Sequence, residues 1–213
     1  SRGLGDVYKR QTQAGPYATG VSYYPNGAIK QFTYGNGVVH TMTQNARQMP
    51  ARSTDTGGGA VIDMAYGFDP NGNVSAVTDY VDGRQTRSMS YDGLDRLATT
   101  QSVMFGGDNQ AAFTYDALDN LKTFKVGAVS NYVYAYNARQ QLETVSNAGS
   151  GSAVIGLGYD AQGNLANKNG QTYAFDYGNR LRSVPNKESY RYDASGRRVL
   201  SVASNGNIYS LYG

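Results

Sequence analysis

The 213-residue chain is 39% hydrophobic and only 16% charged, with 27 glycines, 19 tyrosines and no cysteine or tryptophan. Its formal net charge is +3, and its basic residues are scattered along the sequence, which argues against nucleic acid as a partner. The lack of cysteine excludes disulfides and thiolate metal sites, and no apolar run approaches the length of a membrane span.

Many tyrosines combined with many glycines are typical of pleated sheet interrupted by tight turns. No stretch keeps the period of a helix over three turns. The composition therefore predicts an all-β fold.

The first part of the chain, residues 1–14, is expected to be a lead-in without repeats. Its opening segment SRGLGDVYKRQ matches nothing that follows, which favours leftover sequence from cloning or read assembly; the alternative is a native lead-in. The terminal residues, Ser1 and Gly213, do not resemble natural chain ends. We therefore expect a fragment of a longer protein.

A heptad recurs through residues 15–213: an aromatic residue, Asp or Asn, two variable residues, Gly or Asp, a polar residue and an aliphatic one. We number these positions one to seven. About nine copies begin at residues 23, 44, 68, 91, 115, 136, 159, 175 and 192. The spacing is 21–24 residues and shortens to 16 and 17 for the last two copies, whose strands or loops should be trimmed.

Each heptad predicts a hairpin turn. Asp at the second position suits the start of a type I turn, and Gly at the fifth position suits the left-handed residue of a bulge. Asp95, Asp119 and Gln141 are taken to replace that glycine. Since glutamine tolerates a positive φ poorly, we expect the turn at 137–141 to be the most irregular.

The strands on the two sides of the turn differ in pattern. Those entering it carry apolar residues two apart, as in Tyr134 and Tyr136, which places both on one face. Those leaving it carry apolar residues three apart, as in Leu121 and Phe124, which suggests a bulge or a strong local twist. Further two-residue turns are expected at Asp82-Gly83, Asn169-Gly170 and Asn205-Gly206. Because a lone hairpin is marginal in water, the hairpins should stack into one continuous, twisted or spiralling antiparallel sheet.

The motif Tyr-Asp-x-x-Gly-x-Leu at this spacing resembles the YD repeat of the Rhs family, which includes bacterial polymorphic toxins, toxin-complex shells, WapA-like proteins and teneurins. The family's structural repeat positions fall on the aromatic residues Phe68, Tyr91, Tyr115, Tyr136, Tyr159, Phe175 and Tyr192. They also fall on Asp69, Asp92, Asp116, Asp160, Asp176 and Asp193, on Gly27, Gly72, Gly163 and Gly196, and on Leu97, Leu121, Leu142, Leu165 and Leu181.

The resemblance implies an open fragment of a β-shell that encapsulates and delivers a C-terminal toxin. Its partners would be the rest of the parent polypeptide and that toxin cargo, and its location would be secreted or at the cell surface. The family's boundary motif of the DPxGL type is absent, so no self-cleavage is implied. We expect neither an enzyme nor a cofactor. The alternative is a cell-surface adhesion module that binds glycans through exposed aromatic residues.

Three short motifs have a chemical reading. Asp55-Thr56-Gly57 matches an aspartic-protease triplet but has no second copy, so a Gly-rich turn is the better interpretation. Asp69, Asn71 and Asn73 begin like a calcium loop that lacks its later ligands, which favours a hairpin turn. His40 is the sole histidine, so Ser/His/Asp triads and multi-histidine metal sites are excluded as well.

Overall fold

The computed structural model describes residues 11–212, so most of the expected lead-in at 1–14 lies outside the described residues. The chain divides into two compact units, residues 1–114 with 125–130 and residues 115–124 with 131–213. The described residues form antiparallel strands joined by turns, apart from two single-turn 3-10 segments, η1 (Gly83–Gln85) and η2 (Val103–Phe105). The expected all-β fold of tandem hairpins is therefore confirmed.

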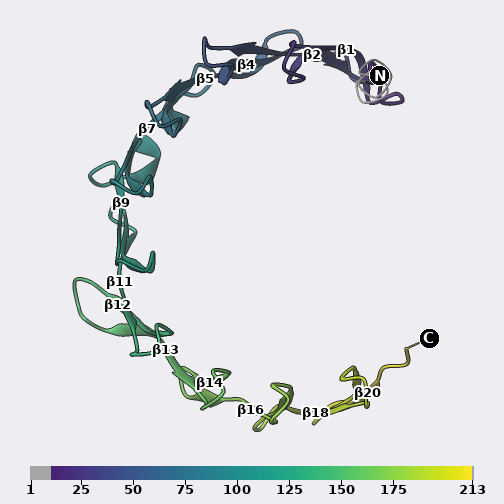
Figure 1. Cartoon of the computed structure of the whole chain (residues 1–213), viewed down its shortest axis with the longest axis vertical. Coiled ribbons are helices and arrows are strands. Elements are labelled where there is room, and N and C mark those ends of the chain that lie inside the picture. Colours follow the sequence, from purple (N-terminus) through teal and green to yellow (C-terminus); the bar gives the residue numbers. More distant parts are fainter. Residues whose placement is uncertain (1–10, 213) are drawn as a thin grey trace, which may run out of the picture. The chain divides into compact units, whose positions relative to one another are not determined.

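In the first unit, each strand pairs with the strands before and after it in the sequence, so the sheet grows in chain order (Figure 1). The strands that lie wholly or mainly in the described part of this unit are β1 (Ala18–Tyr23), β2 (Ile29–Tyr34), β3 (Val39–Gln44), β4 (Pro50–Thr56), β5 (Ala60–Phe68), β6 (Val74–Asp79), β7 (Arg87–Tyr91), β8 (Leu97–Gln101) and β9 (Gln110–Tyr115).

The second unit follows the same rule. Its described strands are β10 (Leu121–Val126), β11 (Ser130–Tyr136), β12 (Leu142–Asn147), β13 (Ala153–Tyr159), β14 (Leu165–Lys168), β15 (Gln171–Thr172), β16 (Ala174–Phe175), β17 (Leu181–Val184), β18 (Glu188–Tyr192), β19 (Arg198–Ala203) and β20 (Gly206–Tyr209).

The ladder of this second unit is interrupted at Tyr173. β15 pairs with β14, whereas β16 pairs with β17 and opens a separate sheet of five strands. The strands around the interruption have two to four residues, against six or seven in β10 to β13. The short spacing of the last heptads thus trims the strands, as predicted.

A β-bulge beside the turn occurs in eight of the heptad hairpins and explains the apolar spacing of three. In the hairpin of β11 and β12, Tyr136 pairs with Leu142, but Ala135 pairs with Thr144, so Glu143 is the extra residue. Val145 then pairs with Tyr134. Because paired residues share a face, the bulge returns Val145 to the face of Leu142. The suggested bulge is therefore confirmed.

Four of the buried side chains lie three residues after the seventh heptad position. Val77, Thr100, Val145 and Val184 occupy this place in four repeats, with relative exposures of 5%, 7%, 5% and 9%. Ala111 on β9 pairs with Thr100 and is buried as well. The aromatic residues of the heptads and their seventh-position leucines are only half-buried. The apolar face of this single-layered sheet thus remains partly open within the described residues.

The expected turns between repeats are only partly correct. Asn169 and Gly170 form the predicted two-residue turn, with φ of 51° and 86°. Asp82, however, caps the 3-10 segment η1 through a bond from the Arg84 N–H, so the prediction of a two-residue turn there is wrong. At the last site Ala203 pairs with Gly206, which places the turn at Ser204 and Asn205, one residue earlier than predicted.

Thr100 provides a test of this packing. Its hydroxyl is buried without a hydrogen-bond partner, at a place where three other repeats carry valine. Thr100→Val keeps the shape and removes the unsatisfied group, so we expect a gain of about 1 kcal/mol in the free energy of unfolding. Urea denaturation followed by circular dichroism measures it, with Thr99→Val as a control because the Thr99 hydroxyl bonds to Ser90. A loss of stability in Thr100→Val would show that the buried hydroxyl does not destabilise the sheet.

Candidate functional site

The most regular feature of the structure is the heptad turn, which closes with the same two backbone hydrogen bonds in all nine copies. The N–H of the second position donates to the carbonyl of the sixth, and the N–H of the fifth donates to the carbonyl of the second. The N···O distances lie between 2.8 and 3.3 Å. One local geometry is therefore built nine times from variable residues.

The fifth position has a positive φ in every copy, between 58° and 100°. Four copies place glycine there. The others place Gln48, Asp95, Asp119, Gln140 and Asn179. Gln140, not Gln141, replaces the glycine of its turn, and that turn closes with two ordinary bonds of 2.9 Å. The predicted irregularity at 137–141 is therefore wrong, because the glycine position of this heptad was assigned to Gln141 instead of Gln140.

The aspartate of the second position organises its turn. In the turn of Asp160, one carboxylate oxygen accepts the N–H groups of Gln162 and Asn164, both at 2.9 Å, and the other accepts the Asn164 side-chain amide at 2.9 Å. Asp116 accepts the same three bonds from Leu118 and Asn120 at 2.8–3.0 Å. One side chain therefore satisfies backbone donors that would otherwise be left to water.

In three copies, arginine at the sixth position donates to the aspartate of its turn, as asparagine does in other copies. The Nε of Arg96, Arg180 and Arg197 donates to the aspartate of its own turn at 2.8, 3.0 and 3.0 Å. The sequence analysis treated the sixth position only as polar. In the heptads with Asp at the second position, the sixth residue is always one whose side chain has an N–H donor, and this restriction is the signal that could have revealed the partnership.

These bonds hold the aspartates in the ionised form. The hydrogen bond from the Asn164 side chain lowers the pKa of Asp160, and those from Asn120 and Arg96 lower the pKa of Asp116 and Asp92. The backbone N–H of Arg197 lowers the pKa of Asp193.

The tyrosine of the first position links neighbouring repeats. Its hydroxyl donates to the carbonyl at the seventh position of the preceding heptad: Tyr91 to Val74 at 2.8 Å, Tyr136 to Leu121 at 3.0 Å, Tyr159 to Leu142 at 2.8 Å and Tyr192 to Leu181 at 2.7 Å. Phenylalanine at 68 and 175 cannot make this bond. The hydroxyls of these four tyrosines are thus engaged within the sheet.

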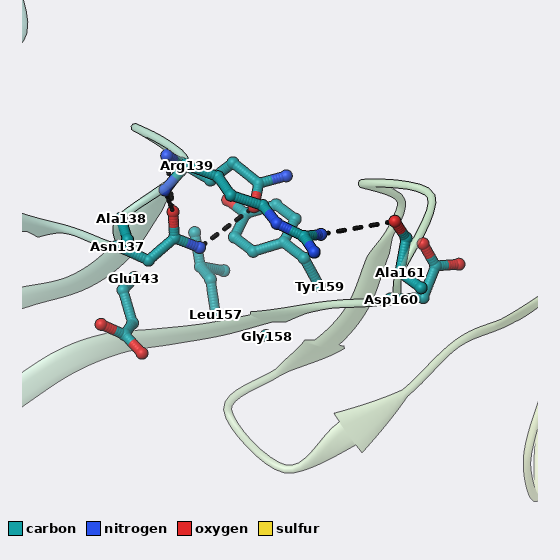
Figure 2. A pocket seen from close by; sticks show the side chains of 10 residues that line it. Asn137, Ala138, Arg139, Glu143, Leu157, Gly158, Tyr159, Asp160 and Ala161 are labelled. Carbon is teal, nitrogen blue, oxygen red and sulfur yellow. Dashed lines mark hydrogen bonds between the residues drawn. The ribbon is translucent and has the colours of Figure 1, made fainter.

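A shallow groove separates the turn at 137–141 from the next one. Figure 2 shows Arg139 reaching across it toward Ala161, whose carbonyl accepts a bond of 3.3 Å from the guanidinium, with the Tyr159 ring between the two turns. Glu143 and Asp160 also line the groove. The groove therefore lies between two consecutive turns, which the bond from Arg139 to Ala161 joins across it.

The triplet Asp55-Thr56-Gly57 does not form a turn at the aspartate. Asp55 lies in β4, is 7% exposed, and its carboxylate is 2.6 Å from Nδ1 of His40 on the paired strand β3. The ring of Phe32 lies 4.8 Å from that of His40. His40 therefore gives a buried carboxylate a side-chain partner on the neighbouring strand, which is a structural role.

The residues that resemble a calcium loop are also engaged. Asp69 accepts the N–H groups of Gly72 and Asn73 and the Asn73 amide at 2.8–3.0 Å. This confirms the hairpin-turn interpretation. Among residues 11–212, no three histidine or acidic residues are grouped as metal ligands, and no helix there is long and apolar enough to span a membrane.

The tyrosine link predicts the effect of removing one hydroxyl. Tyr159→Phe leaves the Leu142 carbonyl without its donor, and we expect a loss of about 1 kcal/mol in the free energy of unfolding. Tyr177→Phe is the matched control, since Tyr177 is 98% exposed, and its effect should stay within about 0.5 kcal/mol. Equal changes in the free energy of unfolding of Tyr159→Phe and Tyr177→Phe, measured by chemical denaturation, would refute a stabilising role of this hydrogen bond.

The aspartate turns predict sensitivity to acid. Their pKa values are lowered by folding, so their stabilisation is complete above the ordinary value of 3.8 and is lost as the pH falls through the lower folded values. We expect the urea midpoint to change little between pH 7 and pH 5 and to fall below pH 4. A midpoint at pH 3 equal to that at pH 7 would show that the carboxylates do not support the turns.

Comparison with solved structures places this arrangement among known folds. A Photorhabdus luminescens Tc holotoxin pore matches with a TM-score of 0.53 and 18% identity over 88% of this chain. The structure of TcdB2-TccC3 without its hypervariable C-terminal region matches with a TM-score of 0.53 and 18% identity over 92%. This chain spans only 11% and 12% of those two chains. No curated protein sequence matches it.

A sequence family supports the same relationship. The family model of the teneurin YD-shell matches residues 70–201, which include heptads four to nine and most of the third. This range covers more than half of the chain. The recurring Asp-capped turns and the tyrosines that join them are thus the repeats of a YD shell, and the chain belongs to the teneurin YD-shell family.

Proposed function

We propose that this segment is a structural part of a shell wall that encloses a polypeptide cargo, with a C-terminal toxin as the favoured cargo. The observation that carries the proposal is the partly open apolar face of a single-layered sheet. A face of this kind in contact with water is unfavourable, and enclosure by the remaining wall or contact with a cargo would cover it.

The burial pattern supports this role. In the described residues only Val77, Ala111, Val145 and Val184 are buried hydrophobic side chains. The aromatic rows of the heptads remain half-buried, although their hydroxyls are satisfied. The sheet is thus held together mainly by its turns and its backbone ladder, which suits a thin wall better than a packed domain.

The fold comparison supports the same role for the parent protein. The matched structures are Tc toxin components, and one of them is the crystal structure of TcdB2-TccC3-Cdc42. By analogy, the partners of this segment would be the rest of its own polypeptide and the cargo, without nucleic acid. Export to the medium or the cell surface follows if the cargo is a toxin, and the segment itself would have no catalytic role.

Protease protection tests the proposal in the complete polypeptide that contains this segment. If the wall encloses a cargo, a fragment outside the repeats should survive digestion by proteinase K while the shell is intact. Val145→Asp places a charge in the buried part of the wall and should expose that fragment. Ala135→Asp is the matched control, because Ala135 is exposed in the paired strand β11.

Protection of the fragment in the unaltered protein and in Ala135→Asp, with loss in Val145→Asp, would support enclosure. Digestion of every part outside the repeats at the same rate in all three proteins would refute it. A glycan array measured on the same unaltered protein tests the adhesion alternative separately.

A further inference from the structure

The five heptads without glycine at the fifth position pose a physical problem. A left-handed backbone is unfavourable for residues with a Cβ, and glutamine is less suited to it than asparagine or aspartate. Nevertheless Gln48 and Gln140 have φ of 62° and 61° there. Turn geometry alone does not explain why glutamine is used at these positions.

Contacts with the preceding turn supply a reason in four cases. Gln48 accepts a side-chain amide hydrogen from Asn26 at 3.2 Å, and Gln140 accepts one from Asn120 at 3.1 Å. The other two acceptors are Asp95, which accepts from Asn71 and Asn73 at 2.7 and 2.8 Å, and Asn179, which accepts from Asn164 at 3.0 Å. Every donor is an asparagine of the turn immediately before.

Two glycine turns use a different contact. Arg47 donates to the backbone carbonyls of Asp69 and Pro70 at 2.7 and 3.0 Å, in the turn that contains Gly72. A Cβ at Gly72 would lie 3.5 Å from that guanidinium, so a longer side chain would compete with it for space. Arg139 reaches Ala161, in the turn that contains Gly163, in the same way (Figure 2).

One other pair of consecutive turns lies within a unit, the turn at 176–180 and the turn at 193–197. This pair shows what happens when the donor side chain is missing. Gly178 takes the place that Asn26, Arg47 and Arg139 occupy in other turns and has no side chain to donate. Arg180 instead bonds to Asp176 of its own turn, and its guanidinium lies 5.6 Å from the Tyr192 ring centre. No side-chain bond joins these two turns among the described residues.

We propose that, in six pairs of consecutive turns, the fifth heptad position is a recognition site by which a turn selects the turn before it. A side-chain acceptor there takes an asparagine amide, and glycine there admits an arginine onto the backbone carbonyls. The row of turns therefore carries a matched sequence of donors and acceptors that fixes the order and register of the hairpins. This inference does not depend on the proposed cargo.

A double-mutant cycle on the 213-residue chain tests the asparagine half of the rule. Gln140→Gly relieves the backbone strain but removes the acceptor, and Asn120→Ala removes the donor. We expect Gln140→Gly to lower the urea midpoint, by a shift on the order of 0.5 M, and to have no such effect in the Asn120→Ala background. Asn120 also bonds to Asp116, but that loss is common to both backgrounds and cancels in the cycle.

Asn186→Gly is the matched control for strain alone. Asn186 has a φ of 63° in the connection between β17 and β18, and its side chain makes no hydrogen bond within the described structure. Its replacement should leave the midpoint unchanged or raise it. If Gln140→Gly raises the midpoint as Asn186→Gly does, or if the effects of Gln140→Gly and Asn120→Ala simply add, the recognition site is refuted.

Converting an arginine contact between two turns into an asparagine contact tests the selectivity of the fifth position. Gly163→Gln should lower the midpoint, because the new side chain competes with Arg139, and Arg139→Asn added to it should recover part of the loss by supplying a matching amide. Recovery supports the rule. A further fall of the midpoint in the double variant would show that the two kinds of step are not complementary.

Discussion

The structure depends on one interaction, the acceptance of backbone N–H donors by an Asp or Asn side chain at the second position of eight of the nine heptad turns. A sheet that grows hairpin by hairpin has no second layer to fix its register, so each hairpin must define its own. Asp116 and Asp160 do this by binding two backbone N–H groups and one side-chain amide each. The bulge that follows is what brings Val145, three residues after Leu142, back to the apolar face. The turn therefore decides which residues the strands bury.

Neighbouring hairpins are then joined at two levels. The tyrosine hydroxyls tie the first position of one heptad to the seventh-position carbonyl of the previous one, as Tyr159 does with Leu142. The turn side chains form a second line of contacts, as Asn120 does with Gln140. Both are polar bonds at the margin of an apolar face that is only half-buried. A sheet with these properties is held by its turns and its backbone ladder, and its apolar face stays partly open.

The sequence predicted much of this arrangement because the heptad recurs at each place where the backbone turns. Nine heptads located nine turns, and the apolar spacing of three suggested the bulge that Glu143 forms. The failures have local causes. Gln141 was taken for Gln140 because the heptad beginning at Tyr136 has two adjacent glutamines, and Asp82-Gly83 was assigned to a hairpin because a dipeptide does not reveal that its aspartate will cap a 3-10 turn. The links between repeats join residues 11 to 24 positions apart, so one repeat read alone does not show them.

Residue-resolved amide hydrogen exchange tests the central role of the aspartates most directly. The N–H groups of Asn120 and Asn164 lie in turns at the edge of the sheet but donate to a carboxylate, whereas the N–H of Ala161, in the same turn as Asn164, donates to no acceptor in the described structure. If the carboxylates hold the turns, Asn120 and Asn164 should exchange much more slowly than Ala161 at neutral pH. Exchange of all three at the rate of an unstructured peptide would contradict the account.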